Sequence, residues 1–264
     1  MINKILHTLP LKLANSIVAH IILKSKVKDV ENYYQNVKLK YASSIKMDLC
    51  KHDIGHQYLA FTGVYENELT KLIMNIKNQD GGVMVDVGAN YGYYSLLWCA
   101  DAVQNQAICF EASPKNLNAI TNNIYINDLS NQIKLEKIAV SNQLGKIYFD
   151  QGSEEQTGWG GISNTSDGVN TVEVETITLD KYFENKNHFH INILKIDTEG
   201  ADYLVIKGAI GLIKNQKIKH IFWEENVYRA KKLGLIGGEA KVLFKENGYK
   251  VSQIGSNEYH AFIS

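Results

Sequence analysis

Carboxyl side chains stand at or near the ends of four apolar runs of this chain, where strand ends are expected. They belong to Asp86, Glu111, Asp197, Glu199, Glu224 and, beside it, Glu225. An ionised carboxyl group accepts hydrogen bonds from hydroxyl and amino groups, and it can take a proton as a general base. Carboxylate oxygens also ligate hard divalent cations. We therefore predict a polar site in which acids bind a hydroxyl or an amine and move a proton.

A glycine-bearing turn follows the first of these runs, Val83 to Val87. Gly88 and Gly92 let the backbone approach a ligand closely, and Asp86 supplies an acceptor at the strand end. A ligand is expected at the carboxyl end of this strand, and these properties suit adenosylmethionine, whose amino-acid end is a zwitterion. A dinucleotide would need Gly-x-Gly-x-x-Gly, and Asn90 in the second glycine position would crowd its pyrophosphate. The turn therefore favours a methyltransferase over a dehydrogenase.

Glu111 ends the next expected strand, 23 residues after Gly88. A carboxylate at this place is positioned to accept hydrogen bonds from two ribose hydroxyls, as in dinucleotide folds. Ala139, near the end of a third strand, would flank the adenine, and core packing is an equally good account of it. The predicted cofactor residues are Asp86, Gly88, Ala89, Asn90, Tyr91, Gly92, Tyr94, Ser95, Glu111, Ala112, Ala139 and Asp197.

Strand-like runs alternate with helical patterns along the part of the chain that carries these residues. The expected strands are 83–87, 107–110, 133–140, 191–196 and 218–223, and the expected helices are 94–100, one opened by Ser113 and Pro114, and 202–213. This alternation predicts a parallel sheet with right-handed crossovers. Two final runs are separated only by residues 255–258, too few for a crossover, so the last strand pairs antiparallel. The predicted fold is α/β: a doubly wound, mostly parallel seven-stranded sheet, Rossmann-like, as in class I methyltransferases.

The N-terminal part is expected to be separate from this sheet. We predict a helical extension or cap over residues 1–76 and the methyltransferase domain over 77–264. Apolar residues recur every four positions from Leu9 to Ile21, which predicts an amphipathic helix, and helices continue to about Tyr41. Packing of the first helix on the core or on a partner subunit is favoured over membrane binding, so a homo-oligomer through these helices is one expectation. The segment Gly152 to Asn170, which holds Trp159, is either a mobile lid or a surface hairpin.

Composition narrows the classes of partner. Lys+Arg and Asp+Glu both total 28, so no net charge attracts nucleic acid or an anionic membrane, and we expect neither. The apolar stretch of residues 13–23 is shorter than the roughly 20 residues of a transmembrane span. Three cysteines without metal-ligand spacing fit a reducing cytoplasm, which is the expected location.

Several motifs together resemble the FkbM methyltransferase family. They are Asp86-Val87-Gly88-Ala89-Asn90-Tyr91-Gly92-Tyr93-Tyr94-Ser95, Phe110-Glu111-Ala112-Ser113-Pro114, Thr178-Leu179-Asp180, and Leu194-Lys195-Ile196-Asp197-Thr198-Glu199-Gly200-Ala201-Asp202 with Lys207-Gly208-Ala209. The Lys-Ile-Asp-x-Glu-Gly element is the most specific of them, and Asp202 stands where the family usually has Glu. The resemblance covers about Ile45 to the C-terminus. It implies an adenosylmethionine-dependent methyltransferase, commonly acting on oxygen in secondary metabolites, glycans and glycan precursors.

Asp197, Glu199 and Glu224 are the predicted catalytic residues, because they follow the fourth and fifth strands beside the expected sulfonium. Their roles would be general base, contact to a substrate hydroxyl, or ligation of a divalent metal, and we do not predict a metal. Three histidines near these strands, His188, His190 and His220, lie where strands begin and are expected to be structural. The predicted activity is O-methylation of a sugar, a sugar nucleotide or a glycan. The alternatives are N-methylation of a small amine and a non-catalytic adenosyl-ligand-binding or scaffold protein.

Overall fold

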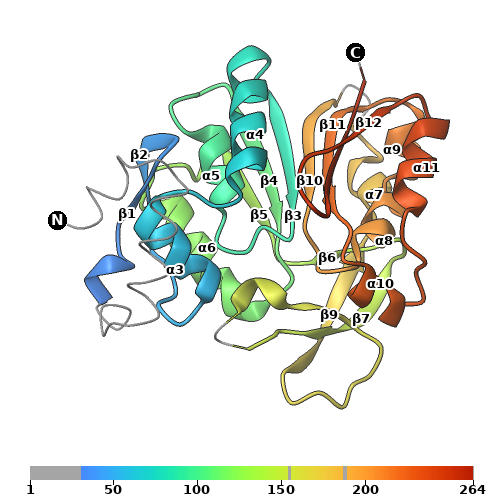
Figure 1. Cartoon of the computed structure of the whole chain (residues 1–264), viewed down its shortest axis with the longest axis horizontal. Helices are drawn as coiled ribbons and strands as arrows, with labels where there is room; N and C mark the ends of the chain where they lie inside the picture. Colours follow the sequence, from blue (N-terminus) through green and yellow to red (C-terminus); the bar gives the residue numbers. More distant parts are fainter. Residues whose placement is uncertain (1–30, 154–155, 187–188, 264) are drawn as a thin grey trace.

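The computed structural model describes residues 31–153, 156–186 and 189–263, so the amphipathic helix predicted near the N-terminus lies outside the described residues. A seven-stranded sheet in the order β12-β13-β11-β10-β3-β4-β5 forms the centre of the fold (Figure 1). Its strands are β3 (Val83–Val87), β4 (Gln106–Phe110), β5 (Ile133–Glu136), β10 (Ile191–Ile196), β11 (Ile218–Glu224), β12 (Lys250–Gln253) and β13 (Glu258–Phe262). The strands from β11 to β5 pair in parallel, and β13 pairs antiparallel with both of its neighbours. The predicted doubly wound, mostly parallel sheet with an antiparallel last strand is confirmed.

Helices cover both faces of this sheet (Figure 1). One face carries α4 (Asn67–Gln79), α5 (Tyr93–Cys99) and α6 (Pro114–Tyr125), and the other carries α7 (Leu179–Phe183), α8 (Asp202–Lys207), α9 (Ile210–Lys214) and α11 (Glu239–Glu246). Alternate side chains of one strand serve the two faces: Met84 packs into the first core, whereas Val85 and Val87 pack into the second. The strand order reverses between β3 and β10, and such a switch point opens a crevice at the carboxyl ends of the strands.

A smaller four-stranded sheet, in the order β6-β9-β7-β8, lies below the main sheet in Figure 1. Its strands are β6 (Ala139–Val140), β7 (Gly145–Asp150), β8 (Gly161–Ser163) and β9 (Thr171–Ile177). The prediction of one strand over 133–140 is therefore wrong: β5 ends at Glu136, and β6 pairs with β9 instead of the main sheet. An apolar run does not reveal a change of pairing partner, because both partners bury the same kind of side chain.

The described part of the N-terminal extension contains a hairpin as well as helices. Its strands are β1 (Val37–Leu39) and β2 (Ala42–Met47), and its helices are η2 (Glu31–Tyr33), α3 (Ile54–Thr62) and α4. Helices were expected as far as Tyr41, and that prediction is wrong for residues 37–41, which form β1 and a turn, because the alternate side chains Val37 and Leu39 are buried. Leu39 and Met47 join the same core as α5, and the division at residue 76 stays a prediction.

The helices of the C-terminal half are shorter than predicted. The helix predicted over 202–213 is two short helices, α8 and α9, which meet at Gly208, where an added Cβ would lie 2.1 Å from the carbonyl oxygen of Ser141. Another short helix, α10 (Val227–Lys232), follows β11. Among the described residues, no helix is both long enough and apolar enough to cross a membrane.

Candidate active site

The glycine turn after β3 is pressed between the two neighbouring strands. Gly88 has φ +79°, and a Cβ added to it would lie 1.9 Å from the carbonyl oxygen of Asp197, at the end of β10. The N–H groups of Gly88 and Ala89 both donate to the carbonyl of Phe110, at the end of β4, at 2.9 and 3.1 Å. Only glycine fits the first position, so the turn brings bare backbone to the crevice.

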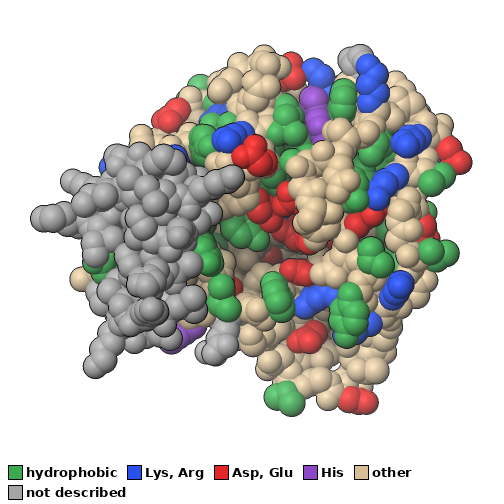
Figure 2. Space-filling model, in the orientation of Figure 1, with side chains coloured by type: hydrophobic (Ala, Val, Ile, Leu, Met, Phe, Trp, Pro, Cys, Tyr) green, Lys and Arg blue, Asp and Glu red, His purple; other side chains and the backbone are tan. Residues whose placement is uncertain are grey.

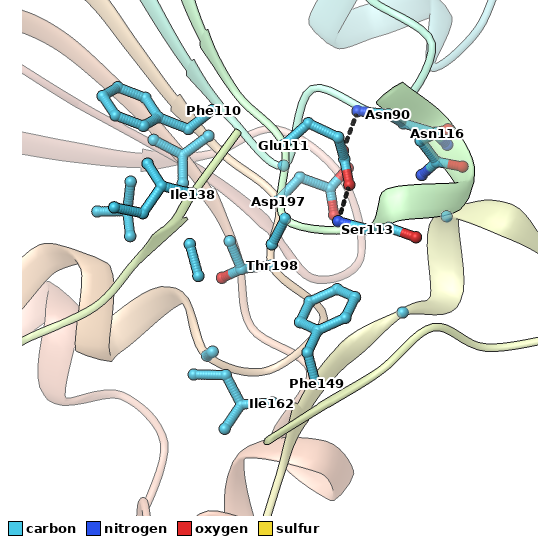
Figure 3. Close-up of a pocket in the computed structure, with 18 of the residues that line it drawn as sticks. Asn90, Phe110, Glu111, Ser113, Asn116, Ile138, Phe149, Ile162, Asp197 and Thr198 are labelled. Carbon is cyan, nitrogen blue, oxygen red and sulfur yellow. Dashed lines mark hydrogen bonds between the residues drawn. The ribbon is translucent and has the colours of Figure 1, made fainter. Parts of the chain in front are cut away.

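Glu111 is the central acid on the β4 side of this turn (Figure 3). One carboxylate oxygen accepts the backbone N–H of Asn90 and the other accepts that of Ser113, both at 2.7 Å. Burial raises the pKa of Glu111 to about 7, and the hydrogen bonds from the two backbone N–H groups oppose that rise. The carboxylate is thus fixed in one orientation by the backbone of two loops.

A cavity with a volume of about 570 Å³ opens beside Glu111, and we call it the β4 cavity. Apolar side chains from both sheets line it: Phe110, Ile138, Ala139, Val140, Phe149 and Ile162 (Figure 3). Three lining residues, Asn90, Ser113 and Asn116, carry a buried oxygen without a hydrogen-bond partner among the described residues. Buried polar atoms are normally paired, so these three suit a polar ligand. The apolar lining with a fixed carboxylate suits a nucleoside.

A second cavity, with a volume of about 900 Å³, lies on the other side of the glycine turn, and we call it the α3 cavity. It is lined by α3 residues, by three tyrosines after the turn and by the strand-end residues of β10: Ile54, His56, Leu59, Tyr91, Tyr93, Tyr94, Lys195, Asp197 and Glu199 among others. Gly88, Asn90, Gly158 and Asp197 line both cavities. The two cavities therefore meet at the turn and at the end of β10.

Lys195 connects the α3 cavity with a smaller recess at the end of β11, the β11 recess. Its buried ammonium lies 2.8 Å from Asp197 Oδ2 and 4.8 Å from the centre of the Tyr94 ring. Burial lowers the pKa of Lys195, but the charges of Asp197, Asp86 and Glu66 outweigh it and raise the pKa overall. Lys195 is therefore a buried cation that three carboxyl groups surround.

Three acids around the α3 cavity and the β11 recess have pKa values near neutrality. Burial, together with the charge of Asp197, raises the pKa of Glu199 to about 7 and that of Glu224 to about 8. Burial also raises the pKa of Glu66 to about 7, although Lys195 opposes it. Tyr94 donates its hydroxyl to Glu66 at 2.6 Å, and the Asn257 amide donates to Glu224. Such groups exchange a proton near pH 7, which is the property of a general base.

The structure brings most of the predicted residues to these cavities. The β4 cavity receives Gly88, Asn90, Glu111, Ala112, Ala139 and Asp197, and the α3 cavity receives Gly88, Ala89, Asn90, Tyr91, Tyr94, Asp197 and Glu199. Glu224 lines the β11 recess. Asp86, Gly92 and Ser95 line none of the three: Asp86 accepts the Ser95 hydroxyl at 2.7 Å, and Gly92 begins α5. Asp86 and Ser95 therefore support the turn from within the core.

Other acids and histidines near the strand ends lie elsewhere. Glu225 lines none of the three cavities and forms an ion pair with Lys241 at 2.9 Å. His220 Nδ1 lies 3.0 Å from His260 Nε2 on β13, and neither ring lines the site. His190 precedes β10, and His188 lies outside the described residues.

Sequence reasoning missed the contribution of the N-terminal part. Asp53 caps α3 by accepting the N–H of His56 at 2.8 Å, and it also accepts the N–H and hydroxyl of Thr157 at 2.6 and 2.9 Å. Thr157 begins η3 (Thr157–Trp159), so the segment expected to be a lid or a hairpin lines both large cavities. Its movement stays a prediction. No local pattern reveals a contact between residues 104 positions apart.

The parts of the chain that the structure describes contain no group of three or more His, Cys, Asp or Glu residues arranged to hold a metal ion.

The family model described as the methyltransferase FkbM domain matches residues 86–251. The chain belongs to this family. It is an S-adenosylmethionine-dependent methyltransferase, and the fold has the strand order of class I methyltransferases. No curated protein matches the chain.

Solved structures with a similar arrangement include three methyltransferases of low sequence identity. A precorrin-6y C5,15-methyltransferase from Geobacter metallireducens has 12% identity and a TM-score of 0.44, over 76% of this chain and 90% of that one. A putative caffeoyl-CoA O-methyltransferase from Staphylococcus aureus has 12% identity and a TM-score of 0.43, over 76% and 85%. The N-terminal domain of human METTL16 in complex with SAH has 14% identity and a TM-score of 0.42, over 74% and 67%.

Proposed function

We propose that adenosylmethionine lies with its adenosine in the β4 cavity and its methionine along the turn toward Asp197. The apolar lining suits an adenine ring, and the Glu111 carboxylate suits the ribose hydroxyls. The three unpartnered oxygens of Asn90, Ser113 and Asn116 supply further acceptors for the cofactor.

The α3 cavity and the β11 recess together form the acceptor groove of this proposal. When bound, adenosylmethionine supplies an electrophilic methyl group on a sulfonium. A hydroxyl acceptor must lose its proton as it attacks, and Glu199, which lines the groove and has a pKa of about 7, takes that proton. Asp197, bound to Lys195, orients the groups at the junction of the two cavities. Glu224 is the second candidate for the base.

The proposed activity is O-methylation of a hydroxyl group on a sugar, a sugar nucleotide or a glycan. The observation that carries it is the pair of acids with near-neutral pKa values in a groove that joins the cofactor cavity at Asp197. Hydroxyl groups are recognised well by such carboxyl groups, which accept and, when protonated, donate hydrogen bonds.

Calorimetric titration with adenosylmethionine and adenosylhomocysteine, with NAD as control and with and without EDTA, tests the cofactor. A panel of sugars is then incubated with adenosylmethionine carrying a deuterated methyl group, and the products are analysed by mass spectrometry. We expect the label on oxygen, and Glu199→Gln should abolish it whereas Glu173→Gln, an exposed control in β9, should not. Label on the nitrogen of amine acceptors alone would replace the proposal by N-methylation.

A further inference from the structure

The acceptor groove is lined by far more acids than cations. Six carboxyl side chains line the α3 cavity and the β11 recess: Asp53, Glu66, Asp197, Glu199, Glu224 and Glu258. Lys195 is the only Lys or Arg among the described residues that line them. Figure 2 shows Asp and Glu side chains gathered in a hollow at the middle of this face of the molecule. The groove therefore carries an excess of negative charge, which grows as pH rises through the pKa values of Glu199, about 7, and Glu224, about 8.

The single cation in the groove is already bound. Lys195 is buried, and its ammonium forms a 2.8 Å ion pair with Asp197. Arg229, near the rim, lies 3.6 Å from Glu199 and donates to the carbonyl of Trp159 at 2.9 Å. Neither side chain is free to bind an anion without giving up these contacts.

One backbone donor at the start of α3 is occupied as well, that of His56. Residues 54–56 line the α3 cavity, and a helix N-terminus is a frequent phosphate site. Here the Asp53 carboxylate accepts the N–H of His56 and adds a negative charge. Burial lowers the pKa of His56, so its ring supplies no cation either.

Neutral contacts are available instead. Tyr65, Tyr91 and Tyr94 line the α3 cavity, and aromatic rings offer apolar area to a sugar ring. Trp223 lines the β11 recess, is 3% exposed, and has an indole N–H without a partner among the described residues. An indole N–H is a donor only, and a hydroxyl or ring oxygen matches it.

We infer that the groove selects an acceptor whose bound part is uncharged, such as a neutral sugar of a glycan, and excludes phosphate-bearing and nucleotide-linked sugars. This inference rests on the proposed function and narrows its three acceptor classes. A nucleoside diphosphate needs Arg, Lys or free backbone N–H groups, and like charges in contact disfavour the wrong partner strongly.

Matched acceptor pairs test it: mannose oligosaccharides against GDP-mannose, and N-acetylglucosamine oligosaccharides against UDP-N-acetylglucosamine. Transfer of a deuterated methyl group from adenosylmethionine is compared within each pair at low ionic strength. We expect kcat/KM for the neutral member to exceed that for the nucleotide by about a hundredfold or more. Equal or better transfer to the nucleotide overturns the inference and leaves O-methylation standing. Absence of label on every sugar, with adenosylmethionine still bound, refutes the O-methylation of sugars instead.

A binding measurement tests, without turnover, whether the groove excludes negatively charged ligands. UDP and glucose 6-phosphate are titrated into the protein loaded with adenosylhomocysteine, and we expect no saturable binding below about 1 mM. Glu258→Lys, which places a cation in the β11 recess, should strengthen binding of UDP about tenfold, whereas Glu173→Lys on the exposed face of β9 should not. Tight binding of UDP to the unmodified protein, or an equal gain in both variants, overturns the inference.

Discussion

The β4 cavity and the acceptor groove use carboxyl groups in opposite ways. In the β4 cavity one acid, Glu111, is held by two backbone N–H groups that lie within 21 residues of it. In the groove six acids come from segments between residues 53 and 258 and line the same cavities as one ammonium group, that of Lys195. The first arrangement holds one hydrogen-bond acceptor in a fixed position for a ligand. The second sets a charge that depends on pH and on distant parts of the chain.

The largest effect is expected from removing the cation of the groove. Lys195→Met leaves the buried Asp86 and the half-buried Asp197 without their counter-charge, so the free energy of unfolding should fall by about 3–5 kcal/mol. Urea denaturation measures this. Lys219→Met is the matched control, because Lys219 forms an exposed ion pair with Asp80 and should contribute less than about 1 kcal/mol. Similar losses of stability in the two variants would mean that the ion pairs of Lys195 contribute no more than an exposed ion pair.

Gly88 lines both the β4 cavity and the α3 cavity, so its substitution tests the boundary between them. In Gly88→Ala the positive φ costs about 1–2 kcal/mol, and the contact with the Asp197 carbonyl forces β3 and β10 apart. Binding of adenosylhomocysteine should weaken at least about tenfold by calorimetry. Gly234→Ala has a similar φ of +76° but nothing within 4 Å, so it should lose stability and keep its affinity. Unchanged affinity in Gly88→Ala would place the cofactor elsewhere.

Glu111 tests the β4 cavity alone. Glu111→Gln replaces one acceptor oxygen by an amide that faces a backbone N–H, and loss of a charged hydrogen bond costs about 1.5–3 kcal/mol. Calorimetry at pH 8 should show adenosylmethionine and adenosylhomocysteine weakened by the same factor, because the ribose contact is common to both. A loss confined to adenosylmethionine would contradict the separation of the two regions.

The smallest effect concerns pH. The pKa values of Glu199 and Glu224 are about 7 and about 8, above the ordinary value of 4.5, so both acids become ionised as pH rises from 6 to 9. Adenosylmethionine carries a sulfonium charge that adenosylhomocysteine lacks. Its affinity relative to adenosylhomocysteine should therefore rise about threefold to tenfold over this range. Glu199→Gln should flatten the lower part of the curve and Glu224→Gln the upper part. A flat curve in the unmodified protein would show that neither acid senses the sulfonium.

Local patterns in the sequence determined the main sheet, the glycine turn and the acids at the strand ends. Period-two burial, turn chemistry and strand ends are properties of neighbouring residues, so Gly88, Glu111 and Asp197 could be located before the fold was known. The antiparallel last strand followed from the shortness of a loop. The Lys-Ile-Asp-x-Glu-Gly element contained Lys195, but nothing in its spacing indicated which acids would surround it.

Only the tertiary structure decided how the groove is closed. The packing of the β1–β2 hairpin against α5, the second sheet, and the hydrogen bonds that Thr157 donates to Asp53 and Tyr94 donates to Glu66 join segments far apart in the chain. Such contacts depend on which surfaces pack together after the strands and helices form. The pKa values of the groove acids depend on the same packing, because burial and neighbouring charges, which no single segment contains, set them.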